Sequence, residues 1–124
     1  MKIRAESVRV GSNPFGCGVL LTGGGLRLSM GIPDLTASKI HNAQNPGSPD
    51  GRMTLEDVMD QHIIQMGITE LRIDNISESG VYSATLVVNG TEHRVVPSEG
   101  ILLCTLAGAP IYFDSDLDGV KPEQ

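Results

Sequence analysis

The chain of 124 residues has no tryptophan, only two cysteines and no long apolar run. Aromatic residues make up 3% of the sequence, so we expect a core built from Val, Ile, Leu and Met. No apolar segment approaches the roughly 20 residues needed to cross a bilayer. The first residues, from Met1 to Glu6, also lack the apolar stretch of a signal peptide. These absences predict a cytoplasmic protein without a membrane partner.

The sequence also lacks a paired-cysteine motif and any run of basic residues. Cys17 and Cys104 share neither a Cys-x-x-Cys motif nor a metal-site spacing, which favours reduced, buried thiols over a disulfide. Nine basic residues stand against fifteen acidic ones, for a net charge of −6, and no run of basic residues occurs. Proteins that bind nucleic acid by charge alone carry a basic stripe. Any nucleic-acid chemistry here therefore needs a local site with cations.

The length and the apolar fraction of 40% indicate one globular domain. Alternating apolar residues predict a first strand with a bulge at Ser7-Val8, and Asn89-Gly90 predicts a hairpin. Pro33, Gly67 and Gly108 suit helix ends, and Ser98 suits an N-cap. The expected strands cover residues 2–10, 17–21, 26–30, 70–76, 81–88, 91–96 and 109–113, and the expected helices cover about 33–43, 54–66 and 98–107.

This order, β-β-β-α-α-β-β-β-α-β, predicts an α+β fold with a mixed, largely antiparallel sheet and about three helices packed on it. The middle helix has the clearest apolar face, which we expect to point inward. That face consists of Leu55, Val58, Met59, His62, Ile63 and Met66.

Several sequence motifs occur in a characteristic order over roughly residues 17–114. The motifs are Met30-Gly31 with Asp34, Thr54-Leu55-Glu56-Asp57, Ile73-Asp74-Asn75-Ile76 leading to Val81-Tyr82-Ser83-Ala84-Thr85-Leu86, Val96-Pro97-Ser98-Glu99-Gly100-Ile101-Leu102-Leu103, and Ala107-Gly108-Ala109-Pro110-Ile111-Tyr112. In this order they resemble the bifunctional nuclease domain family. The resemblance implies a nuclease that cleaves RNA and DNA, with a single domain over 1–114 and an acidic tail over 115–124.

Some motif positions depart from the family pattern. The family typically has the motif Arg-Pro-Ser-Asp-Ala. In this chain Val96 replaces the arginine, Glu99 the aspartate and Gly100 the alanine. Leu55 stands where the family usually has a histidine. Two hypotheses follow. The protein is a nuclease, active or with reduced activity, or it is a non-catalytic dimerising or partner-binding module that keeps the fold.

Asp34 and Glu99 are the best candidates for catalysis and for holding Mg²⁺ or Mn²⁺, because both follow strands at predicted helix starts and match acidic positions of the family. Backbone N–H groups there could bind a phosphate oxygen. The competing interpretation is that both acids only complement helix dipoles. Arg52 and Arg94 are candidates to hold the phosphate, against the alternative of solvated surface arginines.

Two further expectations concern the ends of the fold. Asp114-Ser115-Asp116-Leu117-Asp118-Gly119 imitates the opening of a calcium-binding loop, but a solvated acidic tail is the favoured interpretation. The strands at 2–10 and 91–96 are expected at sheet edges, and pairing of such edges would make a homodimer.

Overall fold

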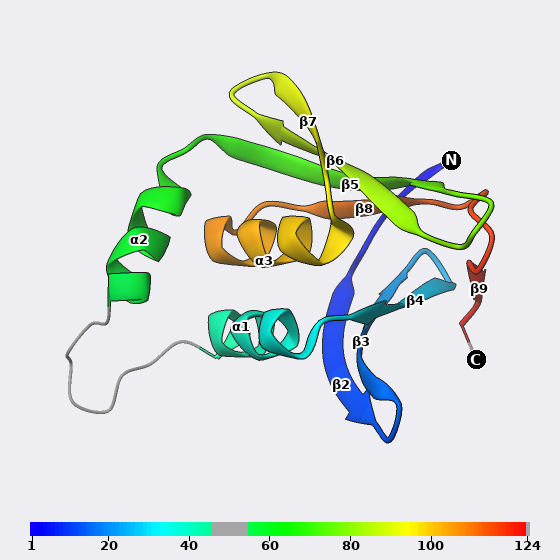
Figure 1. The fold of residues 1–124 in the computed structure, drawn as a ribbon. Coiled ribbons are helices and arrows are strands. Elements are labelled where there is room, and N and C mark those ends of the chain that lie inside the picture. Colours follow the sequence, from blue (N-terminus) through cyan, green and yellow to red (C-terminus); the bar gives the residue numbers. More distant parts are fainter. Residues whose placement is uncertain (46–54, 124) are drawn as a thin grey trace.

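The computed structural model describes residues 1–45 and 55–123 and confirms an α+β fold (Figure 1). Its strands divide between two sheets. The five-stranded sheet has the order β1 (Lys2–Arg4), β8 (Ile111–Asp114), β5 (Ile68–Ile76), β6 (Tyr82–Val88) and β7 (Thr91–Val95). β5 and β8 are parallel, whereas the other pairs of this sheet are antiparallel. The four-stranded sheet is antiparallel, with the order β2 (Ser7–Asn13), β3 (Gly16–Gly23), β4 (Leu26–Ile32) and β9 (Lys121–Pro122).

The predicted first strand over 2–10 is in fact two strands in different sheets. Ala5 N donates to the carbonyl of Ile111 at 2.8 Å, and Glu6 N donates to the carbonyl of Thr22 at 2.7 Å. Two consecutive residues therefore bond to two different sheets, and the expected bulge is a change of sheet. Gly23 makes this crossing possible, because a Cβ at that position would collide with the carbonyl of Arg4.

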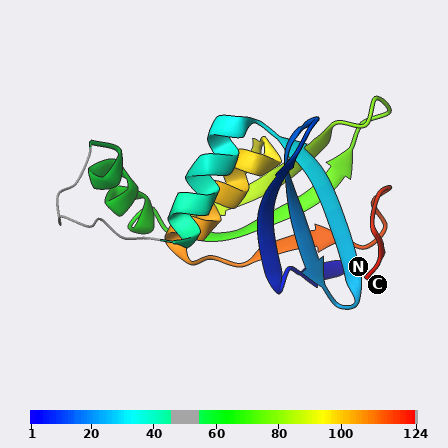
Figure 2. The same ribbon diagram turned by 90° about the horizontal axis from the view of Figure 1, so that it is seen from below.

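α3 (Pro97–Ala107) lies beneath the five-stranded sheet, and α1 (Asp34–Gln44) lies beneath α3 (Figures 1 and 2). α3 packs on β5 and β6, and α1 packs against α3, β2 and β3. α2 (Leu55–Ile64) packs against α3. Within the described residues, no helix combines the length and hydropathy that a bilayer-spanning segment requires.

The core lies where the two sheets meet α1 and α3. It is mainly aliphatic, as expected, with Phe113 as its aromatic member. Its buried apolar residues are Val19, Leu21, Leu28, Met30, Ile32, Ala37, Ile40, Leu71, Ile73, Ala84, Leu86, Ile101, Cys104, Ile111 and Phe113.

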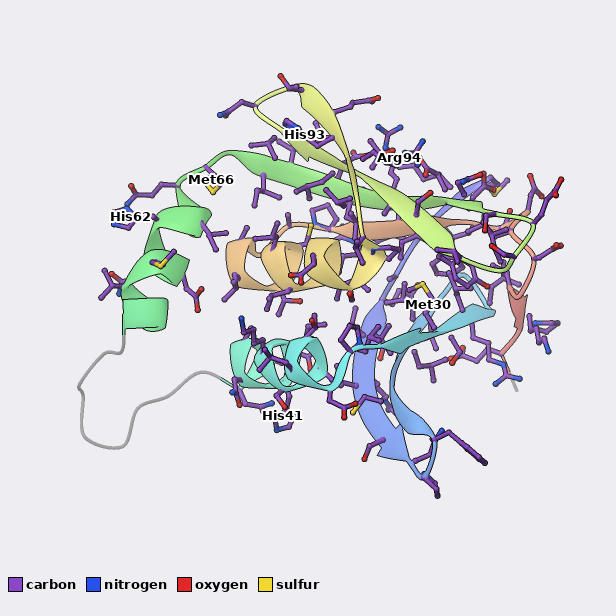
Figure 3. The ribbon with its side chains drawn as sticks, in the orientation of Figure 1. Met30, His41, His62, Met66, His93 and Arg94 are labelled. Carbon is purple, nitrogen blue, oxygen red and sulfur yellow. The ribbon has the colours of Figure 1, made fainter. Side chains whose placement is uncertain are left out.

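The apolar face predicted for α2 is only partly covered. Val58, Met59 and Met66 remain 41%, 59% and 46% exposed, and His62 is exposed too. Figure 3 shows His62 and Met66 on α2 and on the turn that follows it. Because α2 rests on α3 rather than on a sheet, much of its apolar surface meets solvent.

The C-terminal residues return to the fold instead of forming a separate solvated tail. β9 pairs with β4, and Leu117 and Val120 pack against the core. The Tyr82 hydroxyl donates to the carbonyl of Asp118 at 2.8 Å. The carboxylates of this segment stay in water while its aliphatic side chains are partly buried, so residues 115–123 belong structurally to the domain.

Candidate functional site

The starts of α1 and α3 lie at the same end of the helical layer (Figures 1 and 2). Asp34 is the first residue of α1, and Glu99 lies in the first turn of α3. Both side chains are exposed. The first N–H groups of each helix have no partner within the helix and carry the positive end of its dipole. Two carboxylates and two groups of N–H donors therefore share one end of the helical layer.

Proline sets the start of each helix. Pro33 is the N-cap of α1, with φ −62° and ψ 144°, and its carbonyl accepts the N–H of Ala37 at 2.9 Å. Val96 is the N-cap of α3, followed by Pro97 inside the first turn. Ser98 was predicted as this cap. The helix begins earlier than expected, so Ser98 is a buried first-turn residue.

Cys17 is a neighbour of Asp34 that the sequence reasoning did not connect with it. The nearby Asp34 carboxylate, together with desolvation, raises the pKa of the Cys17 thiol. The contact arises because Cys17 pairs with Ile32 across β3 and β4. A correct hairpin register could have revealed it, since Ile32 precedes Asp34 by only two positions.

The other cysteine has a different environment. Cys104 is 1% exposed in α3, and burial raises the pKa of its thiol to about 12. Both cysteines are free, which confirms the expectation of reduced thiols; Cys17, however, is only half-buried.

Arg94 is held by an acidic partner on β5. Its Nη1 donates to Asp74 Oδ1 at 2.8 Å, and the Thr85 hydroxyl donates to the other oxygen, Oδ2, at 2.8 Å. Arg94 also pairs directly with Thr85 across β6 and β7. The guanidinium is therefore engaged by a carboxylate of its own sheet.

Arg94 lies on the face of this sheet that points away from α3. A Cβ added to Gly100 of α3 would touch the side chain of Leu71, so Leu71 faces the helix. Adjacent strand residues point to opposite faces, which places Arg72, and with it Arg94, on the outer face. The structure thus separates Arg94 from Asp34 and Glu99, with which it was expected to act. Arg52, the other predicted phosphate ligand, lies outside the described residues.

The rest of this outer face is also charge-paired. Lys2 Nζ donates to Glu70 Oε2 at 3.1 Å, and Arg72 Nη2 donates to Glu92 Oε2 at 2.5 Å. Arg72 Nε lies 3.1 Å from Glu70 Oε2, within ion-pair distance but off the direction of a hydrogen bond. The pairing with Glu92 is the main cause of the raised pKa of Arg72. These pairs leave little net positive charge for binding phosphates.

Asp34 and Glu99 do not form a cage for a cation with a third donor from the described part of the chain. Among the described residues, no three His, Cys, Asp or Glu side chains are grouped to hold a metal ion. Mg²⁺ commonly keeps several waters and binds one or two carboxylates together with substrate phosphates. An open site of this kind is the mode of cation binding left to the two acids.

A scan against protein-family models finds no family that matches this chain, and a search of curated proteins finds no match. The resemblance to the bifunctional nuclease domain family consequently rests on the sequence motifs.

Proposed function

We propose that the protein is a small nuclease of the bifunctional nuclease type that hydrolyses phosphodiester bonds in RNA or DNA. The observation that carries this proposal is the shared start of α1 and α3, where Asp34 and Glu99 are both exposed. A nuclease has to bind a phosphate and activate water, and this end of the helical layer offers carboxylates for a cation and N–H groups for phosphate oxygens.

Each group has a distinct role in this proposal. Asp34 and Glu99 would hold Mg²⁺ or Mn²⁺, which when bound supplies an activated water and polarises the phosphoryl group. The N–H groups of the first turns would orient the phosphate toward that water. Cys17, which lies beside Asp34, would help to orient that carboxylate.

Cleavage assays test the proposal with isosteric variants. The substrates are single-stranded RNA and DNA in Mg²⁺ or Mn²⁺, and the variants are Asp34→Asn and Glu99→Gln. Each should lose on the order of 100-fold in activity, as expected when a group that stabilises transition-state charge is removed. Arg94→Ala is the matched control, because it removes an exposed charge from the outer face and should leave cleavage unchanged. Activity that is the same in all three variants would identify a contaminant and refute the proposal.

Metal binding provides a second test. A cation that binds only the native state raises the melting temperature. At a cation concentration of 100 times Kd, the free energy of unfolding increases by about 2.7 kcal/mol. Mg²⁺ or Mn²⁺ should stabilise the wild-type protein and leave Glu99→Gln almost unaffected.

The second candidate function is a non-catalytic module that binds a partner. A largely apolar cavity of about 530 Å³ between the helices favours it, because ligand sites are typically apolar clefts of roughly 300–1,000 Å³. Under this hypothesis Mg²⁺ leaves the melting temperature unchanged, whereas Leu103→Asp abolishes association with the partner. The cavity is lined by Lys39, Met59, Asp60, Ile63, Leu102, Leu103 and Leu106.

A further inference from the structure

Phe15 is the most exposed large apolar side chain of the described residues, at 98%. It occupies the turn between β2 and β3, and Cys17 of the same hairpin pairs with Ile32, which precedes the start of α1. The other phenylalanine, Phe113, is 1% exposed in the core. The ring of Phe15 therefore adds nothing to the packing of the domain and is fully available to a ligand.

The turn holds Phe15 in a fixed place. Pro14 has its φ locked by its ring, and the N–H of Phe15 donates to Asn13 Oδ1 at 2.8 Å. Gly16 has φ 137°, a conformation open to glycine, and pairs with Asn13 to close the hairpin. An aromatic ring on such a support loses little conformational freedom when it binds.

The ring also stands close to the proposed site. Phe15 is two residues from Cys17, and Cys17 pairs with Ile32, which precedes Asp34 by two positions. Two residues of extended chain span at most about 7 Å. Leu35, 69% exposed, and Val96, 61% exposed, lie next to Asp34 and at the N-cap of the helix that carries Glu99. Exposed apolar side chains thus flank both carboxylates.

The charge of the chain makes such apolar contacts necessary for a nuclease. The net charge is −6, and Arg72 and Arg94 are paired with carboxylates. Attraction of phosphates by a basic surface, the usual source of affinity, is therefore weak. Stacking of one base on an aromatic ring strengthens binding by roughly 5- to 150-fold and requires no net charge.

We infer that Phe15 stacks on an unpaired base next to the scissile phosphate, so that the substrate class is single-stranded nucleic acid. This inference rests on the proposed nuclease function. Duplexes are poor substrates in this arrangement, because their bases are already stacked and paired inside the helix. Recognition through the face of a base also tolerates many sequences.

The absence of tryptophan from the chain allows a direct test of base contact. Phe15→Trp introduces a single indole, whose fluorescence should be quenched saturably by a single-stranded oligonucleotide. An abasic strand of the same length and a duplex should quench it weakly or not at all. Met66→Trp is the matched control, since Met66 is also exposed but lies at the end of α2, away from the start of α1 (Figure 3). It should show no base-dependent quenching.

Cleavage kinetics separate this inference from the function on which it rests. Phe15→Ala should lower kcat/KM on single strands about 10-fold, within the range expected for one stacked base, and Phe15→Tyr should restore it. Equal kcat/KM in Phe15→Ala and wild type, with no base-dependent quenching in Phe15→Trp, would overturn the role of Phe15 while Asp34-dependent cleavage persists. Failure of the wild-type protein to cleave any strand in Mg²⁺ or Mn²⁺ would refute the nuclease itself.

Discussion

Replacing Gly100 with alanine tests how closely α3 sits on the five-stranded sheet. A Cβ on Gly100 would lie 2.5 Å and 3.0 Å from the two Cδ atoms of Leu71 and 3.2 Å from a Cγ of Val95. Carbon atoms prefer separations of about 3.5–4.0 Å, so the helix or Leu71 would have to move by roughly 1 Å. Leu71 is fully buried and has no free space into which to turn.

Two effects of opposite sign decide the outcome. Alanine in a helix is favoured over glycine by about 1 kcal/mol. Overpacking of a close-packed core costs about 1–3 kcal/mol. Because the contact involves a fully buried side chain, we expect overpacking to win and the Gly100→Ala variant to lose up to about 2 kcal/mol of unfolding free energy, after the helix gain is subtracted.

A double-mutant cycle with Leu71→Val isolates this contact. Valine has no Cδ atoms, so Gly100→Ala in the Leu71→Val background should retain only the helix gain and the milder approach to Val95. Unfolding in urea, followed by circular dichroism, would measure the four free energies. We expect a coupling energy of about 1–2 kcal/mol, in the range seen for residues in contact.

The reasoning would be refuted if Gly100→Ala stabilised the protein by the full helix gain in the wild-type background. A coupling energy near zero would refute it equally. The variant also bears on function, since Glu99 precedes Gly100 and a shift of α3 would displace its carboxylate. Metal-induced stabilisation should therefore weaken in Gly100→Ala and recover in the double variant.

Three further predictions can be checked with standard measurements. Gly31→Ala should raise the free energy of unfolding by about 0.5–1 kcal/mol, because a Cβ at that position meets open space. Gly23→Ala should instead unfold at a much lower urea concentration, because its Cβ would collide with the backbone of Arg4. Burial raises the pKa of the Cys104 thiol from 9.0 to about 12, so between these pH values the folded state keeps a proton that the unfolded state releases. The urea midpoint of unfolding should therefore fall as pH rises from 9 toward 12. Cys104→Ala should remove this dependence of the midpoint on pH. β7 is an edge of the described five-stranded sheet, and we expect it to pair with a second copy in a homodimer. Light scattering should therefore give twice the mass of one chain. A monomeric mass would contradict this expectation.

Local chemistry was enough to predict most elements of the fold. Asn89 and Gly90 both have positive φ, at 50° and 78°, as the hairpin turn between β6 and β7 requires. Gly108, with φ 69°, ends α3 in the left-handed conformation expected of it. These features depend on neighbouring residues alone, so the pattern of the sequence was sufficient to identify them.

Contacts between distant segments were beyond such reasoning. Alternation predicted strands over 2–10 and 91–96 but could not show that the first divides between two sheets, or that Arg94 turns toward Asp74 on the outer face. Sheet membership and pairing depend on which apolar surfaces meet in the core, and that is a property of the whole chain.

The candidate site combines both kinds of information. The sequence alone determined that Asp34 and Glu99 would each begin a helix, because proline and acidic residues mark such positions locally. Only the tertiary structure decided that α1 and α3 start at the same end of the helical layer, with Cys17 beside Asp34 and Phe15 exposed on the same hairpin as Cys17. The physical reason is that helix starts are set by a few adjacent residues, whereas their relative placement follows from the packing of α1 and α3 against each other and the two sheets.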